Sequence, residues 1–371
     1  MKVLNVIWGF TPGGVGKCFL TYCGIGRIEP KLEMVSVCIN LKNTDADTKP
    51  LEDNGVQIIE IRNRKDFSWI KRLNALIGLE RPDLIFTHGF NGPVAVLLCR
   101  LSSGEDVPMV CSYHSEYHPM TKIRRLFAPV FNGVMHFVYR RKALAVLGVS
   151  EYTVKMLTEK YKIPANKVSF VYNGIADVKM QGKNKPIGYP NIDENEVVFA
   201  LVSRLDPVKG IDMFLHAFKL ALEKNRSIEL IVIGDGPERQ RLKELACDYG
   251  IDHKVHFVGI QSNVDEWMAN IDVYCLPSVT ETFALSLVEA MRAGKASIVS
   301  GVGGVLEVAT NETSIVMHKH DYRDWSNAIC HLSKDWELRS RLGESARKRF
   351  LDNFTEEKMM RGVADWLLKN G

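Results

Sequence analysis

No hydrophobic run in this sequence approaches the roughly 20 residues that a membrane-spanning helix needs. The N-terminus also lacks the layout of a signal peptide, because a strand-like segment, 2–8, comes directly before a glycine-rich turn. We therefore expect a cytosolic chain. Its 371 residues are 46% hydrophobic and 25% charged, which excludes a disordered chain, a collagen-like repeat and a disulfide miniprotein. This length predicts about two domains.

Cysteine pairs with metal-binding spacing are missing too. The eight cysteines are scattered, mostly through apolar segments, with no CxxC pair and no cluster with histidine. We interpret them as reduced core residues of an intracellular protein, and we expect no zinc site.

Acidic residues are missing from one long stretch, 117–150. Residues 1–172 contain 23 Lys and Arg and 15 Asp and Glu, which gives a net charge of +8. The whole chain contains 48 basic and 44 acidic residues, so the remaining residues contain 25 basic and 29 acidic ones, a net charge of −4. Within the acid-free stretch, basic residues flank two apolar runs, 126–131 and 135–139. This combination is typical of a surface that binds an anionic membrane. A pair of core-packed helices with solvated basic ends is the alternative, and no motif supports nucleic acid as a partner.

What the sequence does contain is a regular alternation of short apolar runs and helix-length segments. This pattern predicts parallel strands covered by helices on both faces. The expected strands are 2–8, 34–39, 56–61, 83–87, 108–113, 143–149, 196–203, 228–234, 254–258, 272–276, 296–300 and 313–317. We predict an α/β protein of two doubly wound, Rossmann-like domains that face a cleft, with ligands at the carboxyl ends of the strands.

The alternation breaks once, at the polar stretch 177–195, which is rich in Gly and Pro and is interpreted as a linker. The predicted domains are therefore 1–176 and 196–349. The tail 350–371 is expected to form a final helix that crosses back to the N-terminal domain, with Thr355 as its N-cap.

A glycine-rich turn, 11–18, follows the first strand and opens a helix. It fails the phosphate-binding P-loop pattern twice, because Thr11 replaces the first glycine and Cys18 replaces the hydroxyl residue. A bare glycine turn at a helix N-terminus still suits an anion. A tight turn without a ligand is the alternative.

Two cations, Arg204 and Lys209, follow the strand 196–203. At the carboxyl end of a strand and near a glycine, they suit a diphosphate, since Arg binds phosphate as a fork and Lys as a point charge. Solvated loop cations are the alternative.

Two glutamates, Glu281 and Glu289, flank the start of a helix expected from about Phe283 to Ala293, with Gly294 as its stop. Glu289 lies in a mostly apolar helix, where a carboxylate needs a polar partner such as a sugar or ribose hydroxyl. An ordinary exposed helical glutamate is the alternative.

In their order and spacing, these motifs resemble the family 4 retaining nucleotide-sugar glycosyltransferases, of the bacterial O-antigen, capsule and lipopolysaccharide type. The resemblance implies the GT-B fold and covers nearly the whole chain. The matching segments are 12–16, 172–175, 203–210, 234–238, 257–259, the paired glutamates and 303–307.

The resemblance implies roles for the residues of the second domain. Arg204 and Lys209 would hold the donor diphosphate, and Glu289 would bind the ribose. Glu281 would hold the donor sugar, together with the backbone amides of Phe283, Ala284 and Leu285. The segment 258–261, with Val258 and Ile260, would border the base.

The first domain would supply a histidine and two glycines. Gly14 and Gly16 would approach the phosphate and the acceptor. His114 matches the active-site histidine beside the donor sugar. His88, which ends another strand, is its competitor and could line the acceptor groove; either histidine could instead be structural.

The implied activity is retaining, metal-independent transfer of a sugar from a nucleotide donor to a lipid-linked or lipid-anchored glycan. We favour a UDP-sugar as the donor, and GDP-mannose is the alternative. No cofactor and no metal are expected; Asp45 and Asp47 have the spelling of a metal-binding DxD but lie in a polar loop, 41–50. We expect a peripheral enzyme on the cytoplasmic membrane face, docked through 117–150. A GT-B nucleotide-sugar epimerase and a non-catalytic nucleotide-binding switch protein are the alternatives.

Overall fold

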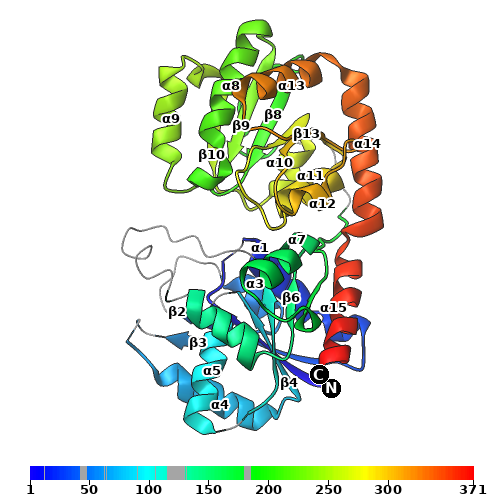
Figure 1. Cartoon of the computed structure of the whole chain (residues 1–371). Coiled ribbons are helices and arrows are strands. Elements are labelled where there is room, and N and C mark those ends of the chain that lie inside the picture. The colour runs from blue at the N-terminus through cyan, green and yellow to red at the C-terminus, as the bar shows by residue number, and fades with distance from the viewer. Residues whose placement is uncertain are drawn as a thin grey trace. The chain divides into compact units, whose positions relative to one another are not determined.

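The computed structural model describes the chain except Pro12, Arg62, Arg64, Phe90, Glu105, Phe131 and residues 42–47, 115–129 and 179–184. The chain forms two compact units (Figure 1). Unit 1 comprises Met1–Gly174 and Glu356–Gly371, and unit 2 comprises Ile175–Thr355. The stretch 177–195 therefore belongs to unit 2.

Unit 1 is built on a parallel sheet of seven strands in the order β3-β2-β1-β4-β5-β6-β7. The strands are β1 Lys2–Trp8, β2 Glu33–Leu41, β3 Gln57–Ile61, β4 Leu84–His88, β5 Met109–Tyr113, β6 Val146–Gly148 and β7 Val168–Phe170. The helical segments described in this unit are α1 Gly14–Cys23, α2 Ile25–Ile28, α3 Lys49–Asp53, α4 Ser68–Glu80, α5 Gly92–Ser103, η1 Val138–Lys142, α7 Glu151–Lys155, η2 Met156–Lys160, η3 Ala165–Lys167 and α15 Glu356–Asn370.

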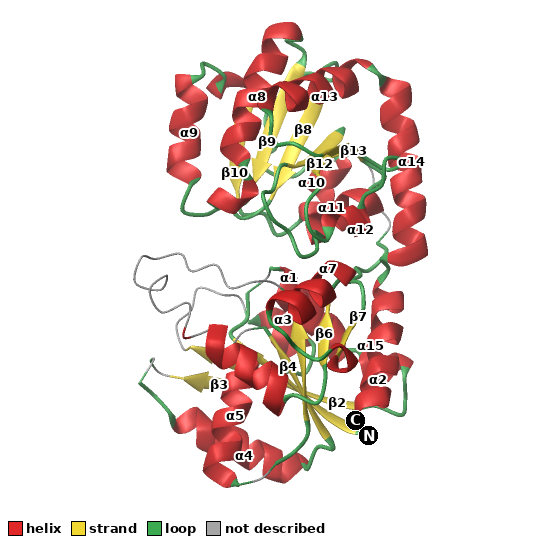
Figure 2. Cartoon of the chain, viewed as in Figure 1, coloured by secondary structure: helices red, strands yellow, loops and turns green. Residues whose placement is uncertain are grey.

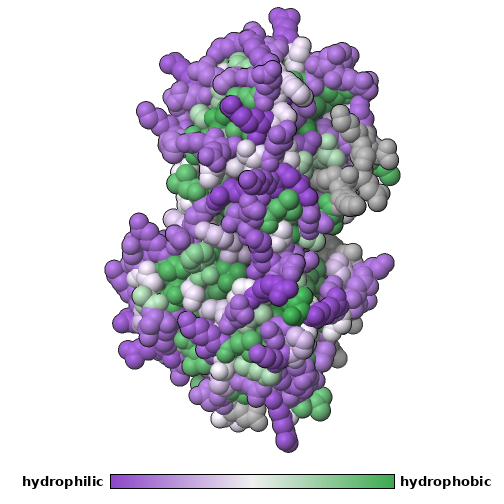
Figure 3. All heavy atoms as spheres, turned by 90° about the vertical axis from the view of Figure 1, so that its right-hand side faces the viewer, coloured by the Kyte–Doolittle hydropathy of each residue, from purple (hydrophilic) through white to green (hydrophobic). Residues whose placement is uncertain are grey.

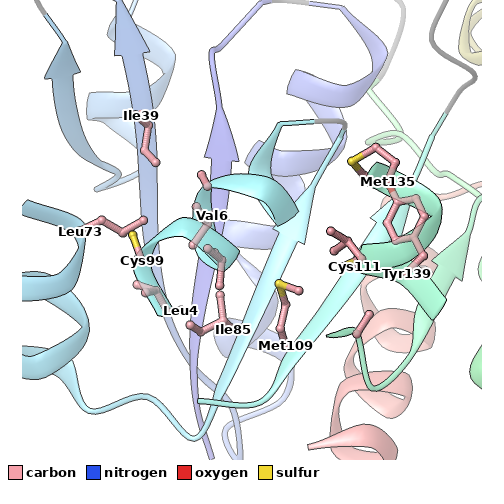
Figure 4. Packing of buried hydrophobic residues seen from close by; sticks show 14 of the residues in the cluster. Leu4, Val6, Ile39, Leu73, Ile85, Cys99, Met109, Cys111, Met135 and Tyr139 are labelled. Carbon is pink, nitrogen blue, oxygen red and sulfur yellow. The ribbon is translucent and has the colours of Figure 1, made fainter. Parts of the chain in front are cut away.

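The two faces of this sheet carry different residues, because side chains alternate along a strand. Leu4 and Val6 of β1 face one core cluster with residues of α4 and α5, as the close-up in Figure 4 shows. Ile7 faces the opposite side, where it packs with Phe19 of α1. Both faces are therefore covered, and polar residues that point from the strands into either layer are buried.

Unit 2 repeats this architecture with six parallel strands in the order β10-β9-β8-β11-β12-β13, flanked by helices (Figure 2). The strands are β8 Val197–Val202, β9 Ile228–Ile233, β10 Val255–Gly259, β11 Val273–Leu276, β12 Ala296–Ser300 and β13 Ile315–Met317. The helical segments are η4 Pro207–Lys209, α8 Ile211–Lys224, α9 Arg239–Asp248, η5 Asp252–Lys254, α10 Val264–Ala269, α11 Leu285–Arg292, α12 Val305–Val308, α13 Tyr322–Lys334 and α14 Trp336–Asn353.

The expected final helix forms as α15, directly after the predicted N-cap Thr355. α14 ends at Asn353, and α15 begins at Glu356. α15 belongs to unit 1, where its Trp366 packs on Phe86 of β4 and donates a hydrogen bond to Ser169. Hydrophilic side chains predominate on the surface of each unit that faces the viewer in Figure 3.

The prediction of two doubly wound α/β domains with parallel sheets is confirmed. Each of the twelve expected strands overlaps an observed one, and the three-residue β7 was missed. That strand is too short to show a periodicity, and it forms by pairing with β6.

Candidate functional site

The loop after β8 carries the two predicted diphosphate cations. Arg204 is exposed, and its guanidinium forms an ion pair with the buried Asp206. Lys209 closes the short helix η4, and Gly210 follows as the N-cap of α8 in the left-handed conformation, with φ of 62°. Both cations therefore stand at the carboxyl end of the central strand, where parallel α/β sheets bind ligands.

Lys209 lies directly against the first predicted glutamate. Its Nζ is 2.5 Å from Glu281 Oε1, and both side chains are largely shielded from solvent. Ser278 Oγ donates a second hydrogen bond, of 3.1 Å, to the same carboxylate oxygen. The fold thus brings together two residues that are 72 positions apart in the sequence, at the edges of β8 and β11.

Backbone hydrogen bonds fix the loops around this pair. The N–H of Val279, after β11, donates to Val208 O at 2.8 Å, and the N–H of Gly304, after β12, donates to Glu281 O at 3.0 Å. A Cβ on Gly210 would lie 2.2 Å from Pro277 O. The approach of the β8 and β11 loops therefore depends on the missing side chain at residue 210.

The helix α11 begins at Leu285, two residues later than expected, and ends at Arg292 with Gly294 at φ of 65° after it. Phe283 and Ala284 are buried in the turn that leads into it. The backbone N–H groups of the first turn have no intrahelical partner and carry the positive end of the helix dipole, so this end of the helix suits a phosphate.

Glu289 lies in the second turn of α11 and is only 5% exposed. It is therefore not the exposed helical glutamate of the alternative interpretation. The buried Tyr274 of β11 hydrogen-bonds to Ser286 at 2.7 Å. Burial is the main cause that raises the pKa of Tyr274 well above its ordinary value, and the charges of Glu281 and Glu289 raise it further.

The loop after β9 packs tightly on the loop after β8. A Cβ on Gly234 would lie 1.9 Å from Ser203 O, and one on Gly236 would lie 2.4 Å from Leu205 O. Beyond this loop, at the end of β10, Val258 is half-buried and Ile260 is exposed. Ile260 thus presents an apolar side chain at the place where the base is predicted.

In unit 1, the glycine turn after β1 leads into α1, whose N-cap is Gly13. A Cβ on Gly16 would lie 1.9 Å from Thr11 O, so this position requires glycine. Gly14 is exposed at the first position of the helix. The close approach of Thr11 O therefore explains the glycine at residue 16 without a bound anion.

His114 lies directly after β5 and is 8% exposed. Its Nε2 is 2.9 Å from Ser112 Oγ, and burial lowers its pKa to about 4. His88 is buried more deeply, and both of its ring nitrogens are hydrogen-bonded within unit 1, to Ser112 and Asn5. This burial argues against His88 as a lining residue of the acceptor groove, and it places His88 behind His114.

Among the described residues, no group of three or more His, Cys, Asp or Glu side chains is arranged to hold a metal ion. Asp45 and Asp47, the DxD-like pair, lie outside the described residues. The described part of the chain likewise holds no helix long and apolar enough to cross a membrane.

Two family models match the chain, one for each unit. "Glycosyltransferase Family 4" matches residues 44–178, and "Glycosyl transferases group 1" matches residues 185–349. The chain is a family 4 glycosyltransferase with the GT-B fold. It is an enzyme, and its substrate is a nucleotide sugar.

Relatives of this glycosyltransferase match over most of its length. An uncharacterized glycosyltransferase of Methanocaldococcus jannaschii is 25% identical over 96% of this chain and 95% of its own. The N-acetyl-alpha-D-glucosaminyl L-malate synthase of Bacillus anthracis is 28% identical over 80% of this chain and 77% of its own. The structure of HepE from Anabaena, in complex with UDP-glucose, superposes with a TM-score of 0.80 and 18% identity over the full length of both chains, which supports the fold.

Three residues that lie beside the candidate site residues were not singled out in the sequence: Asp206, Tyr274 and Ser278. Asp206 stands between the two predicted cations, and its acidic character beside Arg204 was a usable signal. Ser278 and Tyr274 carry no motif, because they act through contacts with residues that only the fold places beside them.

Proposed function

We propose that this glycosyltransferase moves a hexose from a UDP-sugar to a lipid-linked or lipid-anchored glycan, with retention of configuration and without a metal ion. The observation that supports the donor site best is the cluster of Lys209, Glu281 and Ser278 at the carboxyl ends of β8 and β11. Lysine, arginine and a helix N-terminus gather there within one unit. This is the charge that a departing nucleoside diphosphate requires.

The chemistry follows from where charge develops. Breaking the bond between sugar and phosphate builds positive charge on the sugar and negative charge on the leaving diphosphate. Lys209 and Arg204 would stabilise the diphosphate, and Glu281 would hold the sugar. Attack on the same face of the sugar, with the departing phosphate taking the acceptor's proton, gives retention without a second carboxylate as nucleophile.

The names of the relatives support the choice of donor. The Anabaena structure contains UDP-glucose, and the Bacillus anthracis relative is named for an N-acetylglucosaminyl transfer. We therefore favour a UDP-hexose over GDP-mannose. The name of the Bacillus relative also contains L-malate, a small acid. Transfer by this enzyme to a soluble acceptor of that kind would contradict the proposed lipid-linked acceptor.

The surface of unit 1 supports a membrane-linked acceptor. In the described part of the acid-free stretch, Arg140, Arg141 and Lys142 are exposed beside Val134 and Phe137, which are also exposed. Tyr139, in contrast, is buried in the core and does not contribute to this surface. Exposed apolar side chains next to cations are suited to an anionic lipid surface.

The test is slow donor hydrolysis. The protein is incubated with a panel of UDP- and GDP-sugars, with and without EDTA, and release of the nucleoside diphosphate is measured by chromatography. We expect release from a UDP-hexose that is unchanged by EDTA. Release only from GDP-sugars would contradict the proposed donor, and loss of activity in EDTA that manganese restores would contradict the metal-independent mechanism.

A further inference from the structure

His320 lies at the meeting point of four segments of unit 2. It follows β13, and the strands β8, β11, β12 and β13 are consecutive neighbours in the sheet. Its Nε2 is 3.1 Å from Ser278 O, after β11, and 3.4 Å from Ser300 Oγ, at the end of β12. A Cβ on Gly210, after β8, would lie 3.0 Å from His320 Cε1. The imidazole therefore packs against the loops that form the candidate donor site.

The backbone on both sides of His320 is anchored to α13. The indole N–H of Trp325, a fully buried residue of this helix, donates to Lys319 O at 3.3 Å. Asp321 caps the N-terminus of α13, because its carboxylate accepts two backbone N–H groups of the first turn. These contacts hold the imidazole in place, although much of the side chain is exposed.

The carbonyl group of Ser278 determines where His320 carries its hydrogen. Ser278 is fully buried, so its carbonyl oxygen cannot turn to water and needs a donor within the protein. A carbonyl oxygen only accepts, and His320 Nε2 must therefore carry a hydrogen and donate it. An imidazole can do this in the neutral and in the protonated form. The contact therefore does not depend on the charge of the ring.

The same serine connects His320 to Glu281. Ser278 Oγ donates to Glu281 Oε1 at 3.1 Å, and Lys209 Nζ lies 2.5 Å from that oxygen. Both donors bind Oε1, and the second carboxylate oxygen, Oε2, is the one that can accept a hydrogen bond from a sugar hydroxyl. The direction in which the carboxylate turns therefore depends on where Ser278 is held.

We propose that His320 is a positioning residue of the donor site. It holds the Ser278 peptide, which keeps Ser278 Oγ on Glu281 Oε1 and turns Oε2 towards a hydroxyl of the donor sugar. This role rests on the proposed function of Glu281 in holding that sugar. Because His320 acts through Ser278, its loss impairs use of the nucleotide sugar and leaves the affinity for free UDP unchanged.

The first test compares side chains at residue 320. His320→Gln keeps an N–H close to the position of Nε2, whereas His320→Leu keeps the bulk and removes the donor. For the UDP-hexose that wild type hydrolyses, we expect kcat/KM to fall about tenfold or more in His320→Leu and to stay within about threefold of wild type in His320→Gln. Calorimetry should give equal UDP affinity in all three proteins. Equal kcat/KM in the two variants, or a matching loss of UDP affinity, would overturn the role.

The second test asks whether His320 acts through Ser278. Ser278→Ala removes the hydroxyl that reaches Glu281 and keeps the carbonyl that His320 binds. We expect Ser278→Ala alone to lower kcat/KM, and His320→Leu to cause less than about threefold further loss in that background, because the two side chains serve one contact. Additive losses would show that His320 acts by another route and would overturn the proposal.

His331→Leu is the matched control, because it makes the same change at an exposed histidine of α13 whose ion-pair partner is Asp335. It should leave kcat/KM at the wild-type value. A loss as large as that in His320→Leu would overturn the role.

A spectrum of the wild-type protein tests the hydrogen bond without activity. Two-bond ¹H–¹⁵N spectra of the ¹⁵N-labelled full chain report which ring nitrogen carries hydrogen, and His320→Gln assigns the signal. We expect hydrogen on His320 Nε2, and a ring with hydrogen only on Nδ1 would overturn the proposal, even if His320→Leu does not fold. Should wild type hydrolyse no nucleotide sugar at all, the proposed function fails, while the spectra still decide the contact with Ser278.

Discussion

The contact between Lys209 and Glu281 changes how the donor site is understood at the scale of single residues. The family resemblance implies that Lys209 holds the diphosphate and that Glu281 holds the sugar. In the structure, the carboxylate lies 2.5 Å from the ammonium group, so each residue sets the position and the charge environment of the other. We therefore expect their proposed contributions to catalysis to be coupled.

A double-mutant cycle measures this coupling. We expect Lys209→Ala and Glu281→Ala each to lower transferase turnover at least tenfold, or about 1.4 kcal/mol. The double variant should lose about 0.5–3 kcal/mol less than the two single losses together, as for other residues in direct contact. The exposed pair Arg361 and Glu357 on α15 is the control, and its cycle should show no effect on turnover. Strictly additive losses at Lys209 and Glu281 would contradict the coupling.

The lowered pKa values of the buried His88 and His114 predict how the free energy of unfolding depends on pH. His114 has an ordinary pKa of 6.5 that burial lowers to about 4. The unfolded chain therefore binds a proton below pH 6.5 that the folded chain rejects until about pH 4, and the free energy of unfolding falls as the pH decreases through this window. Each such group contributes a slope of about 1.4 kcal/mol per pH unit.

Denaturant unfolding between pH 7 and 4.5 tests this prediction. The slope should be shallower in His114→Asn than in wild type, because one of the two histidines no longer titrates. Thr87→Val, which removes no titrating group, should keep the wild-type slope. If His114→Asn also keeps that slope, His114 accepts its proton in the folded state, and its low pKa is refuted.

At the scale of elements, the turn between η4 and α8 holds the donor loops together. Gly210 has φ of 62°, and a Cβ there would lie 2.2 Å from Pro277 O. We expect Gly210→Ala to push the β11 loop away from Lys209 and to weaken nucleotide affinity at least tenfold. Gly250→Ala is the matched control, since Gly250 has φ of 68° but no atom within 4 Å of its Cβ position.

Calorimetry with the free nucleotide, together with thermal unfolding, separates strain from the loss of the site. Both variants should unfold at a lower temperature, because a left-handed conformation costs about 1–2 kcal/mol for a residue with a Cβ. Only Gly210→Ala should also lose nucleotide affinity. Equal affinities in the two variants would show that the close approach at Pro277 is not needed for binding.

The strands could be predicted from the sequence, but the contacts between side chains on neighbouring strands could not. Mostly apolar runs such as 2–8 and 296–300 predicted β1 and β12 to the residue, because a strand covered on both faces is apolar at most of its positions. The buried polar contacts of Asn5 with Ser36 and His88, and of His88 with Ser112, were not predicted. These residues are polar positions in mostly apolar strands, and only the register between strands shows that they share a face.

The candidate site divides in the same way. The cations and glutamates of unit 2 belong to local motifs, so Arg204, Lys209, Glu281 and Glu289 could be named from the sequence. The ion pair between Lys209 and Glu281 could not be predicted, because the neighbouring strand β11 brings Glu281 to Lys209. The burial of His88 was likewise decided by packing against α1.

At the scale of the whole molecule, the surface charge of unit 1 predicts membrane docking. Each engaged Lys or Arg contributes about 1 kcal/mol at an anionic leaflet. In liposome flotation we expect binding that needs anionic lipid, weakens with salt, and falls in the double variant Arg140→Ser and Arg141→Ser. The same charge loss in unit 2, through Arg341→Ser and Lys348→Ser at exposed positions of α14, should leave flotation unchanged. Equal flotation of both double variants, or none for wild type even at low salt, would contradict docking through this surface.

The account of the whole enzyme depends on unit 2 as the donor-binding unit, and calorimetry with free UDP tests this most directly. Wild type should bind UDP, and Lys209→Ala and Glu289→Ala should each bind it at least tenfold more weakly, because they lose the diphosphate and ribose contacts. Glu281→Ala should retain UDP binding, since its proposed partner is the sugar. Wild-type UDP affinity in both Lys209→Ala and Glu289→Ala would contradict the assignment of the donor site.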